Sequence, residues 1–391
     1  MNFIKKPILS IVIPTINRYE TLIPLIENLM MWDYDNFEII INDNSQQNDE
    51  FLIFLNGLVY NDKLKYFHIH ERLSAIENCD LAISRATGTY VCFIGDDDGL
   101  VPQTIDFCIW MKENNIQSMY CNIGLYTWPE TGHAVNINKG FNSKLVFSKY
   151  SGKLSIVDPR DEMEKLIKSG AQNLFNVPRV YQGIVSKKCL QSLFDNLGTY
   201  FPGPVPDMSN AIALNSLVEK HCFIDLPIII SGHSKKSMSG RNSLRLHQGE
   251  IRQEESLPNN TLENWSPKIP LFWSAPTIWA EAALKASTKM GMDELFKKFN
   301  YARVYANCFA FCDKKFYSRT IKVIFENNGI FEILNIIIKI NYYLIEITLK
   351  RVLNFSKKYI IGIKGIYCND IGEAILQTKK VIGNYEKYIK K

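Results

Sequence analysis

Three short polar clusters each follow a run of β-branched and aromatic residues within the first hundred positions. They are Pro14-Thr15-Ile16-Asn17-Arg18, Asn42-Asp43-Asn44-Ser45 and Gly95-Asp96-Asp97-Asp98-Gly99. Three consecutive aspartates after an apolar strand are costly, because each carboxylate raises the pKa of its neighbours. A divalent cation removes that cost, and hard oxygen ligands suit Mg²⁺ or Mn²⁺, which also bridge the phosphates of a nucleotide. An acidic surface turn after an ordinary core strand is the alternative explanation.

The segments that carry these clusters alternate between strand and helix patterns. We expect strands at 9–13, 37–42, 64–70, 90–94 and 118–123, with helical apolar periodicity between them. This alternation predicts an α/β fold with a mostly parallel sheet covered by helices. Ligands of such sheets bind outside the carboxyl ends of the strands, so the three clusters should converge on one rim.

The charge of the chain is unevenly distributed. The 391 residues include 45 Lys and Arg against 40 Asp and Glu, a formal charge of +5. Residues 314–391 contain 15 basic and 6 acidic side chains, a net charge of +9, which leaves −4 for the rest. With 46% hydrophobic and 22% charged residues, the composition excludes a disordered or collagen-like chain. An acidic body with a basic tail indicates a catalytic or binding domain joined to a segment that meets an anionic surface.

The nine cysteines show no framework spacing, which favours free thiols in a reducing compartment. Cys308 and Cys312 are four residues apart, but no second Cys/His pair accompanies them, so a metal site there is disfavoured. The apolar stretch at 8–13 is too short for a secretory signal and favours a first strand. We therefore expect a cytoplasmic protein.

Three segments resemble the signatures of family 2 glycosyltransferases with the GT-A fold, and their order and spacing match too. These segments are Ile11-Val12-Ile13-Pro14-Thr15, Glu38-Ile39-Ile40-Ile41-Asn42-Asp43-Asn44-Ser45 and Gly88-Thr89-Tyr90-Val91-Cys92-Phe93-Ile94-Gly95-Asp96-Asp97-Asp98. The resemblance is specific over residues 8 to about 102, looser to about 240 and absent beyond. A polar, broken stretch at 232–270 suggests a boundary. We expect a Rossmann-like GT-A domain at 1–240 and a helical C-terminal region at 241–391.

The resemblance also implies roles for individual residues. In the nucleotide pocket it implies, in chain order, Pro14, Thr15, Asn17 and Arg18, with Asp43 reading the base edge and Asn78 facing ribose and diphosphate. Asp43 as a plain turn residue is the alternative, since Asn-Asp-Asn-Ser favours turns.

The triple aspartate resembles the Asp-x-Asp metal motif, but Gly95 stands where the commonest form begins with Asp. The division of metal and ribose roles therefore stays open. We favour Asp96 and Asp98 as metal ligands, with Asp97 as the alternative, and assign Asp96 and Asp97 to nucleotide-sugar binding as well.

A transferase of this type needs a base that removes the proton of the acceptor hydroxyl. Asp207 follows two prolines and stands at or near the start of an expected apolar helix at 208–219. In many relatives an aspartate at such a position serves as the base. A simple helix cap is the alternative, because Asp is common there. Asp195 and Asp225 are the fallback candidates.

The segment 231–241 combines small hydroxyl residues, glycines and cations, which suits a loop around a diphosphate. His233 is a candidate third metal ligand, as a downstream His is in some similar enzymes; a structural or exposed histidine is the alternative. The cations Lys235, Lys236 and Arg241 bind phosphate or are simply solvated. Acceptor-side candidates are Tyr126, Trp128, Tyr181 and Gln182, for which core packing is the alternative.

The segment 330–351 predicts a helix with a narrow polar stripe and a broad apolar face. Its charged residues argue against a membrane-spanning helix. The cations and apolar residues that follow resemble an interfacial anchor on anionic lipid, and a buried helix of a subdomain or dimer interface is the alternative. We expect no nucleic-acid binding, because so much of the segment is aliphatic.

We therefore predict a metal-dependent, inverting glycosyltransferase that uses Mn²⁺ or Mg²⁺ and a nucleotide-diphosphate sugar, with a UDP-sugar favoured. The expected acceptor is a saccharide or lipid-linked saccharide in surface polysaccharide synthesis, at the inner face of the cell membrane. The alternatives are a non-catalytic nucleotide-sugar-binding or membrane-assembly subunit of the same fold and a sugar nucleotidyltransferase. The latter is disfavoured because no Gly-rich loop with Lys or Arg follows the first strand. An oligomer stays open.

Overall fold

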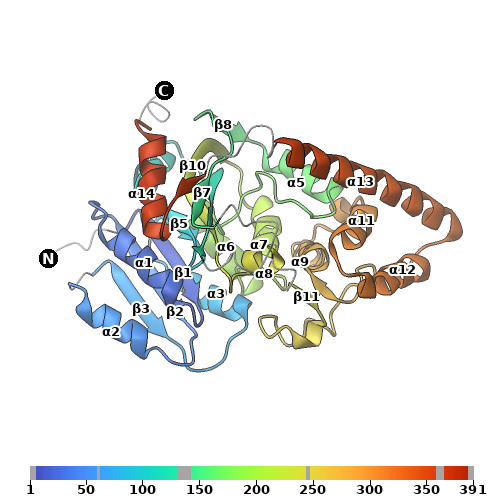
Figure 1. Cartoon of the computed structure of the whole chain (residues 1–391), viewed down its shortest axis with the longest axis horizontal. Coiled ribbons are helices and arrows are strands. Elements are labelled where there is room, and N and C mark those ends of the chain that lie inside the picture. The colour runs from blue at the N-terminus through green and yellow to red at the C-terminus, as the bar shows by residue number, and fades with distance from the viewer. Residues whose placement is uncertain (1–5, 60–61, 130–141, 244–246, 358–364, 386–391) are drawn as a thin grey trace.

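The computed structural model describes residues 6–59, 62–129, 142–243, 247–357 and 365–385 (Figure 1). A mixed sheet with helices on its faces forms the body of the molecule, and helices dominate the chain after it. The expected α/β architecture with a helical C-terminal region is confirmed.

The N-terminal half of the sheet is parallel. It contains β1 (Leu9–Thr15), β2 (Phe37–Asp43), β3 (Leu64–His68) and β4 (Tyr90–Phe93), in the order β4-β1-β2-β3. The helices between these strands are α1 (Tyr19–Met30), α2 (Asp49–Gly57) and α3 (Ala75–Ser84). Thr15 is in register with Asp43, so β1 and β2 end side by side. The predicted convergence of the strand ends on one rim is confirmed for these strands.

The other half of the sheet is built from more distant segments. Short β9 (Ile184–Ser186) lies antiparallel between β4 and β6 (Ser118–Thr127). The long β10 (His221–His233) runs parallel to β6 and also pairs with β5 (Gly99–Leu100) and β8 (Leu154–Val157). Beyond β6 lie β7 (Lys144–Val146) and β13 (Ile366–Tyr367). Strand β10 ends at His233, and the backbone N–H groups of Gly232 and Ser234 at this end bind Asp98 and Asp97 in the run after β4.

Three further helices occur in this half of the chain, namely α4 (Thr104–Glu113), α5 (Pro159–Lys168), which packs on α7 (Pro206–Asn215), and α6 (Lys187–Leu197), which packs on β9. Helix α7 begins with Pro206 at its first position, where a missing N–H costs nothing. The short α8 (Met238–Ser243) and a 3₁₀ turn at Ile251–Gln253 follow β10, and β11 (Gln248–Gly249) pairs with β12 (Trp273–Ser274).

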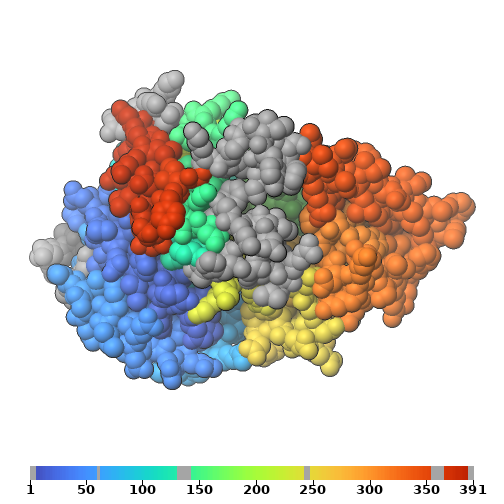
Figure 2. All heavy atoms as spheres, in the orientation of Figure 1, coloured from blue at the N-terminus to red at the C-terminus, as the bar shows by residue number. Residues whose placement is uncertain are grey.

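The C-terminal helices are α9 (Ala275–Lys289), α10 (Asp293–Phe296), α11 (Tyr301–Phe311), α12 (Tyr317–Glu326) and α13 (Ile330–Lys357). Helix α11 packs between α9 and α13. Figures 1 and 2 show α12 and α13 at the end of the molecule that lies farthest from α1 and α2. No helix among the described residues is long and apolar enough to cross a bilayer.

The last helix returns to the sheet. Helix α14 (Ile371–Ile382) packs on α1, β5 and β10, and Ile371 and Ile375 belong to the same core as the buried residues of β1. Asp106 accepts hydrogen bonds from Tyr34 at 2.5 Å and Tyr385 at 2.6 Å, which ties this end of the chain to α4. The segment 365–385 therefore completes the core of the N-terminal sheet.

Candidate functional site

The rim of the sheet brings Thr15, Arg18 and Asp96 into direct contact. The Thr15 hydroxyl donates to Oδ2 of Asp96 at 2.6 Å, and Nε of Arg18 donates to the same oxygen at 3.0 Å. A second nitrogen of Arg18 forms an ion pair with the other oxygen of Asp96. The Arg18 guanidinium thus compensates the Asp96 charge, which is fully buried. Two clusters that are far apart in sequence form one electrostatic unit.

Asp98 is held by nitrogen donors from three segments. Its Oδ2 accepts from the Gly95 N–H at 2.8 Å, and its Oδ1 accepts from the Gly232 N–H at 2.8 Å. Nε2 of Gln182 lies 3.1 and 3.0 Å from the two oxygens, and the Gln182 backbone has a φ of +53°, which non-glycine residues rarely adopt. The approach at Gly232 requires glycine, since a Cβ there would lie 1.7 Å from the Asp97 carbonyl oxygen.

Asp97 faces the end of β10 and the segment after it. Its Oδ2 accepts from the Ser234 N–H at 3.1 Å and from the Ser234 hydroxyl at 2.7 Å, while Oδ1 lies 3.8 Å from an Arg18 nitrogen. Burial lowers the pKa of His233, and the negative charge of Asp97 opposes that shift, so the two side chains are within electrostatic reach. Asp97 therefore shares its surroundings with Ser234, His233 and Arg18.

The three aspartates are nearly removed from solvent, with 0, 3 and 1% of Asp96, Asp97 and Asp98 exposed. Burial raises the pKa of Asp96 to about 6, although the charge of Arg18 opposes the shift. Burial and then the charge of Asp97 raise the pKa of Asp98 to about 7. Like-charge repulsion contributes as expected, but loss of hydration is the larger cause.

Asp43 is enclosed by hydroxyl groups. Its Oδ2 accepts from Tyr19 at 2.6 Å and Tyr66 at 2.7 Å, and its Oδ1 accepts from the Ser45 N–H at 2.8 Å. The Asp43 side chain is fully buried. Tyr19 and Tyr66 were not among the site residues identified from the sequence.

The remaining predicted nucleotide residues lie on the same rim. Asn17 is exposed, has a φ of +54°, and its backbone N–H donates to the Ser45 hydroxyl at 2.7 Å. Asn78 is 7% exposed; its amide accepts from Asn42 at 2.5 Å and donates to the Thr15 carbonyl at 3.3 Å. Pro14 is half-buried in β1. The amide of Asn78 therefore braces the loop after β1.

Asp207 is the second residue of α7, close to the predicted position, and is half-buried. Its Oδ1 accepts from the Met208 N–H at 2.7 Å. Burial raises the pKa of Asp207, and the opposing influences include the charge of Arg179 and a hydrogen bond from Trp279. The raised pKa of the buried Tyr181 hydroxyl reflects burial and then the charges of Asp98, Asp97 and Asp207. Tyr181 thus lies within electrostatic reach of both Asp207 and the aspartate run.

The fallback bases lie in other surroundings. Asp195 is exposed on α6 and accepts from Gln191 at 2.8 Å. Asp225 is held by the Asn122 amide at 2.8 Å and by the N–H and hydroxyl of Ser151 at 2.8 and 2.7 Å. These contacts tie Asp225 to loop structure.

The predicted phosphate loop at 231–241 is partly helical, because α8 begins at Met238. Lys236 reaches the first cluster, where Nζ donates to the Asn17 carbonyl at 3.1 Å and pairs with Glu20 at 2.7 Å. Arg241 pairs with Glu254 at 2.9 Å, and Lys235 is exposed.

The acceptor-side candidates separate into two groups. Tyr126 is fully buried and donates to the Cys368 carbonyl at 3.1 Å, and Trp128 is 5% exposed and donates to the Asp97 carbonyl at 3.0 Å. Tyr126 and Trp128 therefore take the core-packing alternative rather than an acceptor-binding position. Tyr181 and Gln182 are half-buried and lie beside the aspartates.

The predicted metal set Asp96, Asp98 and His233 is not assembled as one cluster. Within the described residues, no three His, Cys, Asp or Glu side chains are grouped so that they could hold a metal ion. Asp96 is paired with Arg18, and both oxygens of Asp98 face nitrogen donors. Asp97 and His233 are within electrostatic reach of each other, and a carboxylate with an imidazole fits Mn²⁺ or Mg²⁺ when phosphates and water complete the shell.

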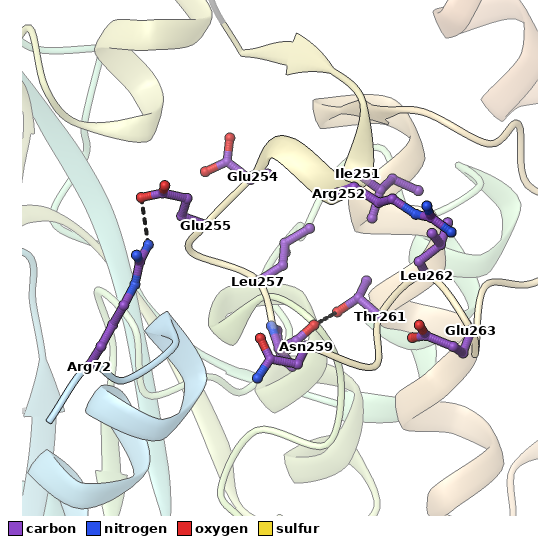
Figure 3. Close-up of a pocket in the computed structure, with 11 residues that line it drawn as sticks. Arg72, Ile251, Arg252, Glu254, Glu255, Leu257, Asn259, Thr261, Leu262 and Glu263 are labelled. Atoms are coloured by element: carbon purple, nitrogen blue, oxygen red, sulfur yellow. Dashed lines mark hydrogen bonds and ion pairs between the residues drawn. The ribbon is translucent and has the colours of Figure 1, made fainter.

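Two cavities lie on either side of the segment after α8. The smaller, of about 490 Å³, lies between Arg72, which follows β3, and residues 251–263 (Figure 3). Arg72 and Glu255 form an ion pair at 2.5 Å across its edge. The larger, of about 980 Å³, lies between the start of α3, residues 199–204 and α9. Its lining includes four acidic and four basic side chains, namely Glu77, Asp80, Glu281, Asp293, Lys268, Lys285, Lys289 and Lys297.

Residues 10–109 match the family model described as glycosyl transferase family 2. A Campylobacter jejuni protein named GalNAc(5)-diNAcBac-PP-undecaprenol beta-1,3-glucosyltransferase is 26% identical over 135 residues, which cover 30% of this chain and 44% of that protein. The putative colanic acid biosynthesis glycosyl transferase WcaA of Escherichia coli is 31% identical over 109 residues, covering 27% of this chain and 38% of WcaA. The chain spans less than half the length of these relatives.

Among solved structures, Staphylococcus aureus TarS 1-349 in complex with UDP-GlcNAc is similar at 14% identity and a TM-score of 0.49. The match covers 81% of this chain and 79% of that one. The mannosyltransferase PcManGT from Pyrobaculum calidifontis, solved with GDP-Man and Mn²⁺, has 14% identity and a TM-score of 0.40. It covers 89% of this chain and 88% of PcManGT.

Proposed function

We propose that this protein transfers a sugar from a nucleotide-diphosphate sugar to a saccharide or lipid-linked saccharide acceptor, with inversion at the sugar, because residues 10–109 match the model of glycosyl transferase family 2. One observation carries the proposal above the others. Thr15, at the end of β1, and Arg18, after it, bind Asp96, which follows β4. Another Arg18 nitrogen lies 3.8 Å from Asp97, so a cation and carboxylates meet at the carboxyl ends of the strands.

The nucleotide-diphosphate sugar binds at the carboxyl ends of β1, β2 and β4. Asn17 and Arg18 offer a backbone loop and a guanidinium to the donor, and Lys236 brings a second cation to the same loop. Asp43 is assigned to the base and Asn78 to the ribose side. Since both are buried and hydrogen-bonded, they act by holding the loop in place or after a local rearrangement that frees one hydrogen bond.

A divalent cation, Mn²⁺ or Mg²⁺, would supply charge stabilisation for the leaving diphosphate. Asp97 and His233 would hold it, together with oxygens of the diphosphate. We choose Asp97 rather than Asp98 because the cationic nitrogen nearest to Oδ1 of Asp97, on Arg18, is 3.8 Å away. Asp98 instead positions the aspartate run through Gln182 and the Gly232 N–H. Asp96 aligns Arg18 and the Thr15 hydroxyl.

Asp207 acts as the base. Its carboxylate accepts the proton of the acceptor hydroxyl as that oxygen forms a bond to the anomeric carbon. The bond from the anomeric carbon to the diphosphate oxygen breaks in the same step, and the electron pair leaves with the nucleoside diphosphate. Partial burial supports this role, because it raises the pKa of Asp207 and makes the carboxylate a better proton acceptor.

The larger cavity is the proposed binding site of the acceptor. Gly203 and Pro204 line it, and Asp207 lies three residues further along the chain. A lining with acidic and basic side chains suits a ligand with many hydroxyl and amide groups. The name of the Campylobacter jejuni relative supports a lipid-linked acceptor, and the name of WcaA supports a role in surface polysaccharide synthesis.

The test is the release of nucleoside diphosphate from a panel of UDP-, GDP- and dTDP-sugars, measured with Mn²⁺, with Mg²⁺ and with EDTA. We expect one donor, a UDP-sugar first, to give metal-dependent transfer to a saccharide acceptor or slow hydrolysis without one. Absence of turnover with every donor, combined with nucleotide binding by calorimetry, would instead indicate a non-catalytic nucleotide-sugar-binding subunit. Release of pyrophosphate from a nucleoside triphosphate and a sugar phosphate would indicate a nucleotidyltransferase.

A further inference from the structure

Helix α13 has two apolar faces, and the described parts of the chain cover only one of them. Ile333, Ile340 and Ile347 recur every seven residues, are only 6 to 7% exposed, and lie on the face that packs toward α11. The opposite side carries six large apolar residues that recur every three or four positions and are 54 to 84% exposed. These are Phe331, Leu334, Ile338, Tyr342, Ile345 and Leu349, which we call the outer face of α13.

The outer face is too continuous for an ordinary protein surface. Isolated exposed apolar residues are normal, but a contiguous patch larger than a few hundred Å² marks an interaction site. Six side chains at this spacing form a stripe along about three heptads of a helix. Figures 1 and 2 show that α13, which carries the stripe, extends to the end of the molecule opposite α1 and α2.

The charges on α13 select the class of partner. Lys339 and Lys350 are exposed on this helix, and Arg351 is exposed on the side toward α11, where it donates to the Ala310 carbonyl at 2.9 Å. Glu332 is the one exposed acid among the described side chains of the helix. The other acid, Glu346, is neutralised by Arg303 at 2.6 Å and Lys350 at 2.5 Å. The sequence continues with Lys357 and Lys358, and residues 314–391 carry a net charge of +9. An apolar stripe with basic neighbours fits an anionic bilayer, whereas pairing two copies would bring two basic surfaces together.

We propose that the outer face of α13 docks on an anionic phospholipid bilayer, with the apolar stripe in the headgroup boundary and the neighbouring cations at the lipid phosphates. The inner face of α13 stays packed on α11, so the protein docks without unfolding this region. Docking does not depend on the transfer reaction, but it would hold the proposed transferase where a lipid-linked acceptor is presented.

The experiment is flotation of the full chain with two kinds of vesicle, phosphatidylcholine alone and phosphatidylcholine mixed with phosphatidylglycerol. We expect about tenfold or stronger binding to the mixed vesicles and a loss of binding as salt rises, because each cation near an anionic surface adds about 1 kcal/mol. The double variant Ile338→Glu/Ile345→Glu should abolish flotation. Both side chains face solvent at 69 and 61% exposure, so the fold should persist, which thermal unfolding checks.

The matched control is Ile53→Glu, an equally exposed isoleucine on α2 at 73%, which should float like the unchanged protein. Flotation that survives the double variant would overturn the proposal. So would a wild-type dimer in light scattering that floats on neither vesicle and becomes monomeric in the double variant, because the occupant would then be a second copy. Nucleoside diphosphate release is measured in parallel, so a failure of the transfer reaction is distinguished from a failure of docking.

Discussion

The aspartate rim and the outer face of α13 depart from the usual distribution of residues in opposite directions. At the rim, three carboxylates lie in the interior, where charges are costly. On α13, large aliphatic side chains lie in water. The two regions differ in what compensates the unfavourable free energy of these placements. Arg18, Gln182, Ser234 and backbone N–H groups compensate the rim from within the chain, whereas the described residues offer nothing that covers the outer face.

This difference predicts which substitutions change the fold and which change only function. At the rim, a side chain serves both stability and chemistry, so a substitution disturbs both. On α13 the two roles are separated by face, since the inner face holds the helix and the outer face is free to bind. Substitutions that test each side of this comparison follow in order of expected effect.

The largest effect is expected at the proposed base. Asp207→Asn should lower kcat for transfer about 10³-fold while leaving donor KM within a few-fold, because the loss of a general base costs about 10² to 10⁴ in rate. The fold should tolerate an isosteric amide at this half-buried position. The measurement is steady-state kinetics with the donor that the panel of nucleotide sugars identifies. Asp195→Asn on the exposed face of α6 is the matched control and should keep full activity. If Asp207→Asn retains transfer, the base lies elsewhere on the rim.

The two faces of α13 should separate cleanly in stability. Ile340→Ala removes a buried side chain and should cost about 3 kcal/mol in the free energy of unfolding, because large-to-small core changes cost about 2 to 5 kcal/mol. Ile338→Ala, on the outer face at 69% exposure, should stay within about 0.5 kcal/mol. Urea unfolding of both variants measures the contrast. Equal losses would mean that both faces are buried in solution.

The N-terminal strands and their rim could be predicted from sequence because every signal there is local. The run at 37–42 is apolar and β-branched, the polar cluster begins at its end, and β2 forms over Phe37–Asp43. The same holds for β1, β3 and β4. The helix expected at 330–351 also forms, as part of α13 (Ile330–Lys357).

The parts that could not be predicted depend on contacts between distant segments. Gly232 reaches Asp98 across 134 positions, and only the tight packing of β10 on the aspartate turn explains why glycine stands there. Strand β9 enters the sheet between β4 and β6 in an antiparallel direction, and this place in the sheet depends on its distant partner strands rather than on its own residues. The return of α14 to β5 likewise leaves no local signal. The roles of Asp96, Asp97 and Asp98 were left open for the same reason, since their partners decide them.

The buried aspartates should make stability depend on pH in an unusual direction. A carboxyl group with a raised pKa binds protons in the folded state that the unfolded state has released, so stability falls as pH rises from about 4 to about 7. In EDTA we expect the free energy of unfolding to fall by about 4 kcal/mol between pH 5 and pH 8, because the folded-state pKa lies about two units above pH 5 for Asp98 and about one unit above it for Asp96, and each unit corresponds to about 1.4 kcal/mol. Urea unfolding across this range measures the slope.

The variant Asp98→Asn isolates the contribution of one carboxyl group to that slope. It should flatten the fall in stability above pH 5, while Asp225→Asn should not, because hydrogen bonds from Ser151 and Asn122 lower the pKa of Asp225 instead. Mn²⁺ with nucleotide should stabilise the unchanged protein more at pH 8 than at pH 5, where Asp96 and Asp98 are protonated and the rim carries less negative charge. A slope that is the same in Asp98→Asn and in the unchanged protein would contradict the assignment.

The smallest effect separates hydrogen bonding from backbone strain at Gln182. Gln182→Ala removes the amide that binds Asp98 and Ser231 and should cost about 2 kcal/mol, because a buried charged group loses a donor. Gln182→Gly removes the same amide but relieves the backbone at φ +53°, so it should cost about 1 kcal/mol less than alanine. Thermal unfolding of both variants gives the difference. If glycine is the more destabilising, the backbone at 182 is unstrained, and the side-chain bonds to Asp98 and Ser231 alone hold this turn against the rim.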